Sequence, residues 1–124
     1  MSKPRPKHLD LTKIRFPVTA IVSGMHRISG TVLFLFIPLL LWLLQQSLAT
    51  EQSFETFRSA VSNPLLKLVL LGLLWAYLHH LCAGIRHLAL DLDWGTDLGP
   101  ARATSKAVLI ISMGLTLVAG AMLW

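Results

Sequence analysis

The amino-acid sequence predicts an all-α membrane protein with three transmembrane helices. Of the 124 residues, 54% are hydrophobic and only 14% are charged, and the mean hydropathy is +0.64. A water-soluble domain carries roughly a quarter charged residues, so most of this surface is expected to face lipid. Three segments contain no Asp, Glu, Lys or Arg: 28–50, 68–85 and 107–124. Each comes close to or exceeds the roughly 20 residues that a helix needs to cross a bilayer.

The net charge of +5 indicates membrane orientation rather than nucleic-acid binding. Nine of the 11 Lys and Arg residues lie before the first charge-free segment or around the connection between the second and third. Only Arg58 and Lys67 lie in the connection between the first and second. Because basic residues concentrate on the cytoplasmic side of membrane proteins, the N-terminus is predicted to be cytoplasmic. Three crossings then place the C-terminus in the periplasm.

The first element is a helix over about residues 19–48, which follows a basic cytoplasmic N-terminal segment, residues 1–18. Pro17 suits the start of this helix, because proline fits the first helical turn. Pro38 lies inside the helix and is expected to kink it rather than end it, as prolines in membrane helices commonly do. The apolar run begins too late and is too long for a secretory signal peptide, so we expect no cleavage.

The second and third helices are separated by a short turn, and the whole chain, 1–124, forms one membrane-anchor domain. The polar connection 49–63 is expected to include a short surface helix. Asn63 and Pro64 combine a capping side chain with a proline at the first helical position, which predicts a second helix over about 64–90. A turn rich in Asp and Gly and containing Pro100 leads to a third helix over about 104–124. Its small residues, including Gly114 and Gly120, would allow close helix contact.

The second helix carries polar residues that are costly inside a bilayer. At about 100° per residue, one face holds Leu73, Tyr77, His80, Gly84, His87 and Asp91, and a different one holds His79 and Arg86. His80 lies about 9 Å further into the membrane than Arg86. Gly84 lacks a side chain, so a flat molecule could lie against the helix beside His80.

Two interpretations of His80 remain open. A neutral imidazole next to such a space is well suited to bind haem iron. A single intramembrane histidine also commonly serves as a hydrogen-bonding contact between helices. A zinc site is disfavoured, because no further cluster of His, Cys or carboxylate side chains completes four ligands.

The first helix begins with a second polar cluster, in which Ser23, Arg27 and Gly30 share one face. A hydroxyl and a guanidinium at the membrane edge can donate hydrogen bonds to a carbonyl oxygen and stabilise negative charge that develops there. A quinone head group fits this chemistry. The alternative is that Arg27 reaches lipid phosphates and anchors the helix.

The two clusters together resemble the motifs of a known family, the cytochrome b subunits of succinate dehydrogenase. Residues 23–30, SGMHRISG, are similar to the motif S-x-x-H-R-x-[ST]-G, and residues 80–91 are similar to H-x-x-x-G-x-R-H-x-x-x-D. The start of the chain, with Arg5-Pro6 and residues 9–11 and 14–17, is also similar. Leu90 departs from the pattern, where an aromatic residue or Met is expected.

The resemblance implies a subunit of a four-subunit succinate:quinone oxidoreductase. The short start of the chain favours the bacterial inner membrane over the mitochondrial one. This chain would pack with a second three-helix anchor subunit into a helix bundle, and the two would hold an iron–sulfur subunit and the succinate-oxidising flavoprotein subunit. The chain would not be active alone. The main alternative is the anchor of a quinol:fumarate reductase. A non-redox transporter or assembly protein is a further alternative, against which all six acidic residues lie outside the spans.

The resemblance also implies residue roles. His80 would be an axial ligand of haem b, opposite a histidine of the second anchor subunit. Ser23 and Arg27 would line the ubiquinone site. The haem propionates and pocket would be contacted by His26, Arg27, Gly84 and His87, and Asp91 would assist proton uptake.

Overall fold

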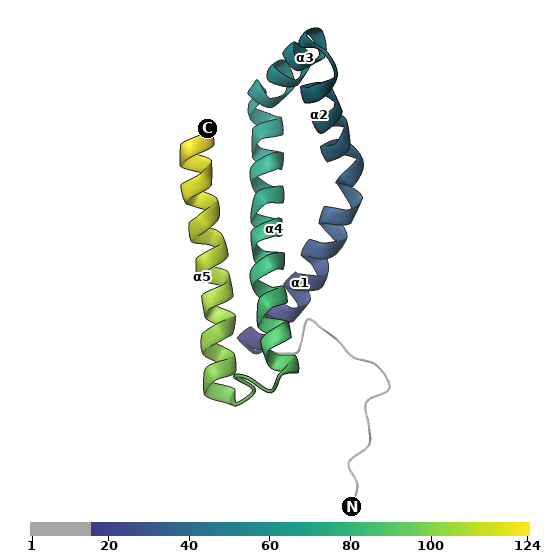
Figure 1. Ribbon diagram of the computed structural model, residues 1–124. Coiled ribbons are helices and arrows are strands. Elements are labelled where there is room, and N and C mark those ends of the chain that lie inside the picture. The colour runs from purple at the N-terminus through teal and green to yellow at the C-terminus, as the bar shows by residue number, and fades with distance from the viewer. Residues whose placement is uncertain (1–15) are drawn as a thin grey trace, which may run out of the picture.

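The computed structural model describes residues 16–124, and all regular secondary structure in this range is helical. The helices are α1 (Val18–Leu35), α2 (Ile37–Ala49), α3 (Glu51–Ser62), α4 (Pro64–Asp91) and α5 (Leu98–Leu123). The α1–α2 pair, α4 and α5 lie side by side, and α3 crosses one end of this layer (Figure 1). The start of α1 and the α4–α5 turn lie together at the other end. Which end faces the cytoplasm stays a prediction from the charges.

The outside of the described helices is largely apolar. Phe34, Leu88 and Ile110 are 70%, 67% and 71% exposed, and similar side chains surround all the long helices. So large an apolar surface is compatible with lipid and not with water. Helices α1, α4 and α5 are each long and apolar enough to cross a membrane. The predicted class, an all-α protein with three candidate membrane spans, is therefore confirmed.

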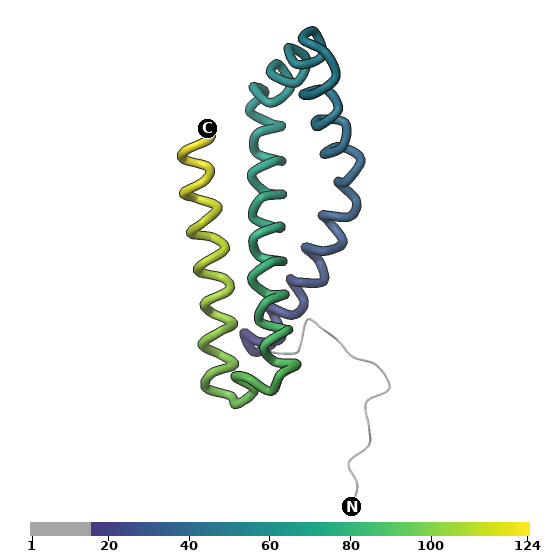
Figure 2. The backbone as a smooth tube through the Cα atoms, in the orientation of Figure 1, coloured from purple at the N-terminus to yellow at the C-terminus, as the bar shows by residue number. Residues whose placement is uncertain are grey.

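Helices α1 and α2 together form one bent rod. Between them, Phe36 has φ −92° and ψ 1°. The backbone hydrogen bonds Phe36 N to Val32 O and Leu40 N to Phe36 O, each 3.1 Å, carry the helical path through the bend. Pro38 has no N–H to donate to the carbonyl one turn earlier, which explains a bend at this position. In Figure 2 the tube moves away from α4 along α1, lies farthest from it near the junction with α2, and returns to it through α3.

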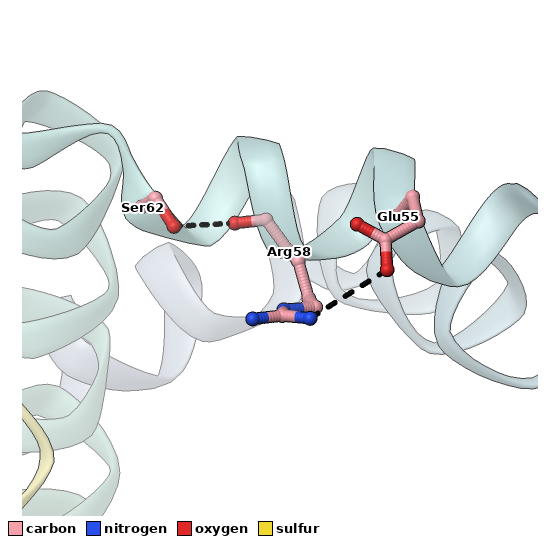
Figure 3. A network of polar contacts seen from close by, with 3 residues as sticks. All are labelled: Glu55, Arg58 and Ser62. Carbon is pink, nitrogen blue, oxygen red and sulfur yellow. Dashed lines mark hydrogen bonds and ion pairs between the residues drawn. The ribbon is translucent and has the colours of Figure 1, made fainter.

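Helix α3 is the short surface helix expected in the connection. Thr50 and Ser53 form a capping box, in which each residue's backbone N–H donates to the other's hydroxyl at 2.9 Å. Figure 3 shows the exposed pair Arg58–Glu55, 3.6 Å apart, and the Ser62 hydroxyl donating to the Arg58 carbonyl at 2.6 Å. Both side chains are largely exposed, which indicates that α3 is a surface helix. An exposed ion pair of this kind contributes little stability.

The expected and observed bounds differ most at the start of α5. The helix begins at Leu98 rather than near residue 104. Pro100 lies in its first turn, where the missing N–H has no helical partner to lose, and Ala101 N already donates to Asp97 O at 2.9 Å. The turn before it contains two residues with positive φ, Asp93 at 60° and Gly95 at 72°. This sequence was expected to continue as a turn to residue 104, and that expectation is wrong.

The three long helices meet through small side chains. Val22, Ala83 and Val108 form the central contact between α1, α4 and α5. Helix α5 contributes the buried residues Ala101, Ser105, Val108, Ser112 and Thr116. Small residues allow membrane helices to approach closely. A Cβ atom at Gly120 would lie 2.9 Å from Leu71 Cδ1, whereas one at Gly114 would meet nothing within 4 Å. Of these two glycines, only Gly120 therefore lies at a close helix contact.

Candidate functional site

His80 reaches from α4 to one turn of α1. Its Nδ1 atom lies 3.1 Å from the His26 carbonyl oxygen and 3.2 Å from Ser29 Oγ. The Ser29 hydroxyl also lies 2.9 Å from the His26 carbonyl, to which it donates a hydrogen bond. Ser29 is buried and the His80 ring is half-buried, so these bonds are largely shielded from the surroundings. One side of the imidazole is thus fixed by two oxygen atoms.

This arrangement selects the tautomer of the neutral His80 ring. A carbonyl oxygen can only accept a hydrogen bond, so Nδ1 must carry the proton. The Ser29 proton is directed to the His26 carbonyl, which leaves a lone pair of Oγ for the same Nδ1–H group. Nε2 consequently carries a lone pair, and it makes no hydrogen bond within residues 16–124. This is the form of imidazole that binds a metal ion.

Gly30 provides the space for the His80 ring. A Cβ atom at position 30 would lie 2.9 Å from His80 Cε1 and 3.4 Å from Nδ1, which is closer than side chains normally approach. A Cβ atom at Gly84 would lie 3.8 Å from His26 Nε2, an ordinary contact. The sequence pattern assigned the space beside His80 to Gly84. The structure instead places Gly84 against His26, and the close approach at His80 belongs to Gly30 of the neighbouring helix.

Three imidazoles form a row across the α1–α4 contact. His26 stacks on His80 with ring centroids 4.2 Å apart and an interplanar angle of 9°, and its centroid lies 5.0 Å from that of His87. Stacked rings direct their nitrogen atoms past one another rather than toward one point. Within the described part of the chain, no group of three or more His, Cys, Asp or Glu side chains could hold a metal ion. An iron at His80 would need its other ligands from a porphyrin and from another chain.

The row borders a shallow, open groove along α1 and α4. The groove has a volume of about 470 Å³ and is lined by His26, Arg27, Gly30, Thr31, Phe34 and His80. Arg27 is exposed and brings a permanent positive charge to it. The groove therefore combines an imidazole, a guanidinium and an aromatic wall on a face that is open to a second molecule.

The other predicted site residues lie further away. Ser23 is half-buried one turn before Arg27 and does not line the groove. Asp91 is exposed at the last position of α4, and His87 approaches the groove only through His26. The structure thus brings His26, Arg27 and His80 together directly, while Ser23 and Asp91 remain at the edges of the site.

Two polar residues of α4 turn away from the groove. The Arg86 guanidinium is 7% exposed and donates from Nε to Thr104 Oγ1 at 3.1 Å and from Nη2 to the Ala101 carbonyl at 3.4 Å. It therefore fastens α4 to the first turns of α5. His79 is fully buried, and within residues 16–124 neither of its ring nitrogens makes a hydrogen bond. The helical period predicted that Arg86 and His79 lie on a different face of α4 from His80. The structure agrees, because both are buried among the helices whereas His80 lines the groove.

The role of Ser29 could not be predicted from the sequence. The sequence feature that pointed to this position was the pair of small residues Ser29-Gly30, which allows a neighbouring helix to approach closely. That pair alone does not show which side chain of the neighbouring helix meets it. The structure shows that this side chain is His80.

Comparison with known proteins identifies the family of this chain. Residues 1–119 match the family described as Succinate dehydrogenase/Fumarate reductase transmembrane subunit. The chain belongs to this family. The match includes both motifs, residues 23–30 and 80–91, and it confirms the resemblance seen in the sequence.

Individual relatives of this succinate dehydrogenase/fumarate reductase transmembrane subunit are bacterial proteins named succinate dehydrogenase cytochrome b556 subunit. The one from Coxiella burnetii is 42% identical over 125 residues, which cover 100% of both chains. The one from Paracoccus denitrificans is 34% identical over 111 residues, which cover 90% of this chain and 85% of the relative. The one from Rickettsia typhi is 29% identical over 113 residues, with 91% and 88% covered.

Proposed function

We propose that this chain is the cytochrome b subunit of a succinate dehydrogenase in a bacterial inner membrane. It would bind haem b and help to form the site at which ubiquinone is reduced. The observation that carries this proposal is His80, whose Nδ1 is bonded to the His26 carbonyl and the Ser29 hydroxyl while Nε2 keeps its lone pair beside an open groove. The names of the bacterial relatives, which describe cytochromes, support it.

The residues around His80 fit a haem group. Nε2 of His80 would be one axial ligand, and a histidine of the second anchor subunit would be the other. Because the groove opens outward, the two anchor chains would enclose the group between them. Arg27 would neutralise a propionate, and His26 with His87 would complete that side of the pocket. A haem bound there supplies one-electron storage beside the path from the iron–sulfur subunit.

Arg27 and Ser23 would bind the ubiquinone head group. The exposed guanidinium can donate to a quinone carbonyl oxygen and stabilise the negative charge that forms on it during reduction. The Ser23 hydroxyl, one turn away, would donate to the same head group, and the isoprenoid tail would remain in lipid. Arginine cannot give up its proton, so the two protons of the reaction must come from elsewhere. Asp91, exposed at the end of α4, would help to take them up from the cytoplasm.

The proposed assembly follows from the distribution of charge. The end that carries Arg27, Arg102 and Lys106 would face the cytoplasm, where the iron–sulfur subunit and the flavoprotein subunit would bind. The flavoprotein oxidises succinate, and this chain receives electrons rather than succinate. It would act only as part of the complex, packed against a second three-helix anchor subunit. Its C-terminus would lie in the periplasm.

The test of this function is the optical spectrum of the purified complex. We expect a b-type reduced-minus-oxidised spectrum and a positive pyridine haemochrome assay, both lost in His80→Ala while the four subunits still assemble. Leu81→Ala, at an exposed neighbouring position of α4, is the matched control and should retain the haem. A colourless wild-type complex, or a His80→Ala complex with an unchanged spectrum, would refute the proposal.

The anchor of a quinol:fumarate reductase is a second candidate, because the description of the matching family includes fumarate reductase. The two functions would use the same residues of this chain. They differ in the direction of electron transfer between succinate and quinone, and in the redox potential of the quinone. Rates measured in both directions with ubiquinone and with menaquinone distinguish them. Faster fumarate reduction with menaquinol would favour the second candidate.

A further inference from the structure

We propose that Ser29 acts on the haem through His80, as a second hydrogen-bond acceptor for its Nδ1–H group that increases the electron donation of its Nε2 atom. This inference rests on the haem function proposed above. It concerns how strongly the ligand donates to iron, and not whether haem is present.

The first step is the geometry at Nδ1. Two oxygen atoms, the His26 carbonyl at 3.1 Å and Ser29 Oγ at 3.2 Å, lie within hydrogen-bond distance of one N–H group. Ser29 Oγ itself donates to the same carbonyl at 2.9 Å, so its lone pairs are available to the imidazole. The carbonyl alone fixes the tautomer. The hydroxyl adds a second acceptor, and Ser29 is only 4% exposed, so solvent does not replace it.

The second step is that the ring is held independently of Ser29. The His26 ring stacks on one face of His80 at 4.2 Å, and Gly30 lies against Cε1 at the ring edge. Removing the hydroxyl should therefore change the hydrogen bonding of His80 more than its position. This separates an electronic effect on the haem from simple loss of the ligand.

The third step is the direction of the effect. A hydrogen bond from Nδ1–H to an acceptor increases the basicity of the metal-binding nitrogen. A more basic ligand favours ferric over ferrous iron, because the ferric ion carries more positive charge. Without the Ser29 hydroxyl the ferric state loses part of this stabilisation, so the midpoint potential of the haem should rise.

The experiment is a redox titration of haem in the assembled complex for three variants. In Ser29→Ala we expect a retained b-type spectrum and about a threefold higher ferrous-to-ferric ratio at a fixed potential, roughly 30 mV at 59 mV per tenfold change for one electron. Ser29→Thr keeps the hydroxyl and should restore the wild-type potential. Ser112→Ala is the matched control. Ser112 is another buried serine that donates to a backbone carbonyl three residues earlier, and within residues 16–124 no hydrogen bond joins it to a histidine.

Each outcome either supports or overturns the role of the Ser29 hydroxyl. Loss of haem in Ser29→Ala overturns the inference, because the ring would then not be held independently of Ser29. An unmoved potential in Ser29→Ala, or an equal shift in Ser112→Ala, overturns the inference. Haem loss in both Ser29 variants overturns it too, because packing would then explain the result. None of these results affects the proposed function, which fails only if the wild-type complex lacks haem or His80→Ala retains it.

Discussion

At the scale of single residues, one turn of α1 controls a side chain of α4. Residues 26–30 supply the carbonyl and the hydroxyl at Nδ1 of His80, the ring that stacks on its face, and the glycine at its edge. The same turn carries Arg27 in the groove. Residues 26, 29 and 30 therefore each meet a different part of one imidazole.

Gly30→Ala should displace the His80 ring. The added Cβ would lie 2.9 Å from His80 Cε1, so the ring or the helices must move. Overpacking of this kind typically costs about 1–3 kcal/mol. We therefore expect the ratio of haem to protein in the purified complex to fall, as measured by the pyridine haemochrome assay.

The matched control is Gly24→Ala in the same helix, where a Cβ atom would meet nothing within 4 Å. This variant should keep its haem, and alanine should slightly favour the helix. If both glycine variants lose haem to the same extent, helix stability rather than contact with His80 explains the loss. If neither loses haem, Gly30 does not limit the position of the ring.

Arg27→Leu should remove quinone reduction while leaving succinate oxidation intact. Loss of a donor that stabilises developing negative charge commonly lowers the rate by about 100- to 1,000-fold. We expect a fall of this size in ubiquinone reduction, while succinate oxidation with an artificial acceptor continues. Arg102→Leu removes an exposed arginine from α5 at the same end and is the control for net charge. Loss of both activities in a fully assembled Arg27→Leu complex would contradict the assignment.

At the scale of elements, the local signals in the sequence predicted the helices well. The absence of charge indicated the spans, and the cap of Asn63, whose side chain accepts from Leu65 N at 2.9 Å, marked the start of α4. Two prolines show the limit of such signals. Pro38 is the second residue of α2, just after the bend at Phe36, and Pro100 is the third residue of α5. Both prolines lie in a first helical turn, and the difference is what precedes them: helix α1 before Pro38 and a turn before Pro100.

The contacts between elements were less predictable. The helical pattern separated His80 from His79, but it did not show that His79 is the buried one and that His80 faces the groove. That outcome depends on how α1 and α5 pack on α4. The contact of α5 also runs along Ser105, Ser112 and Thr116 rather than along Gly114. Hydroxyl residues satisfy their hydrogen bonds on their own helix here, so they pack as small residues.

At the scale of the whole molecule, the face proposed to bind haem is not covered by the chain itself. His80, the proposed iron ligand, lines an open groove together with the exposed Phe34. A single ligand in a groove open to lipid would hold haem weakly and leave it unprotected. A second anchor subunit that closes this face would supply the other ligand and exclude lipid. The proposed haem site is therefore the feature that calls for a partner, since lipid alone can cover the rest of the apolar surface.

The orientation of this assembly in the membrane can be tested with cysteine labelling. In a Cys82→Ser background, Thr56→Cys in α3 and Thr96→Cys in the α4–α5 turn place one exposed thiol at each end of the helix layer. The excess of basic residues at the end that contains the turn predicts that this end is cytoplasmic. A membrane-impermeant maleimide should then label Thr56→Cys in intact spheroplasts, and Thr96→Cys only after detergent and denaturant open the membrane and the complex.

Labelling of Thr96→Cys in intact spheroplasts would reverse the orientation. The quinone site would then lie on the side opposite the proposed electron donor, and the assignment of Arg27 would fail with it.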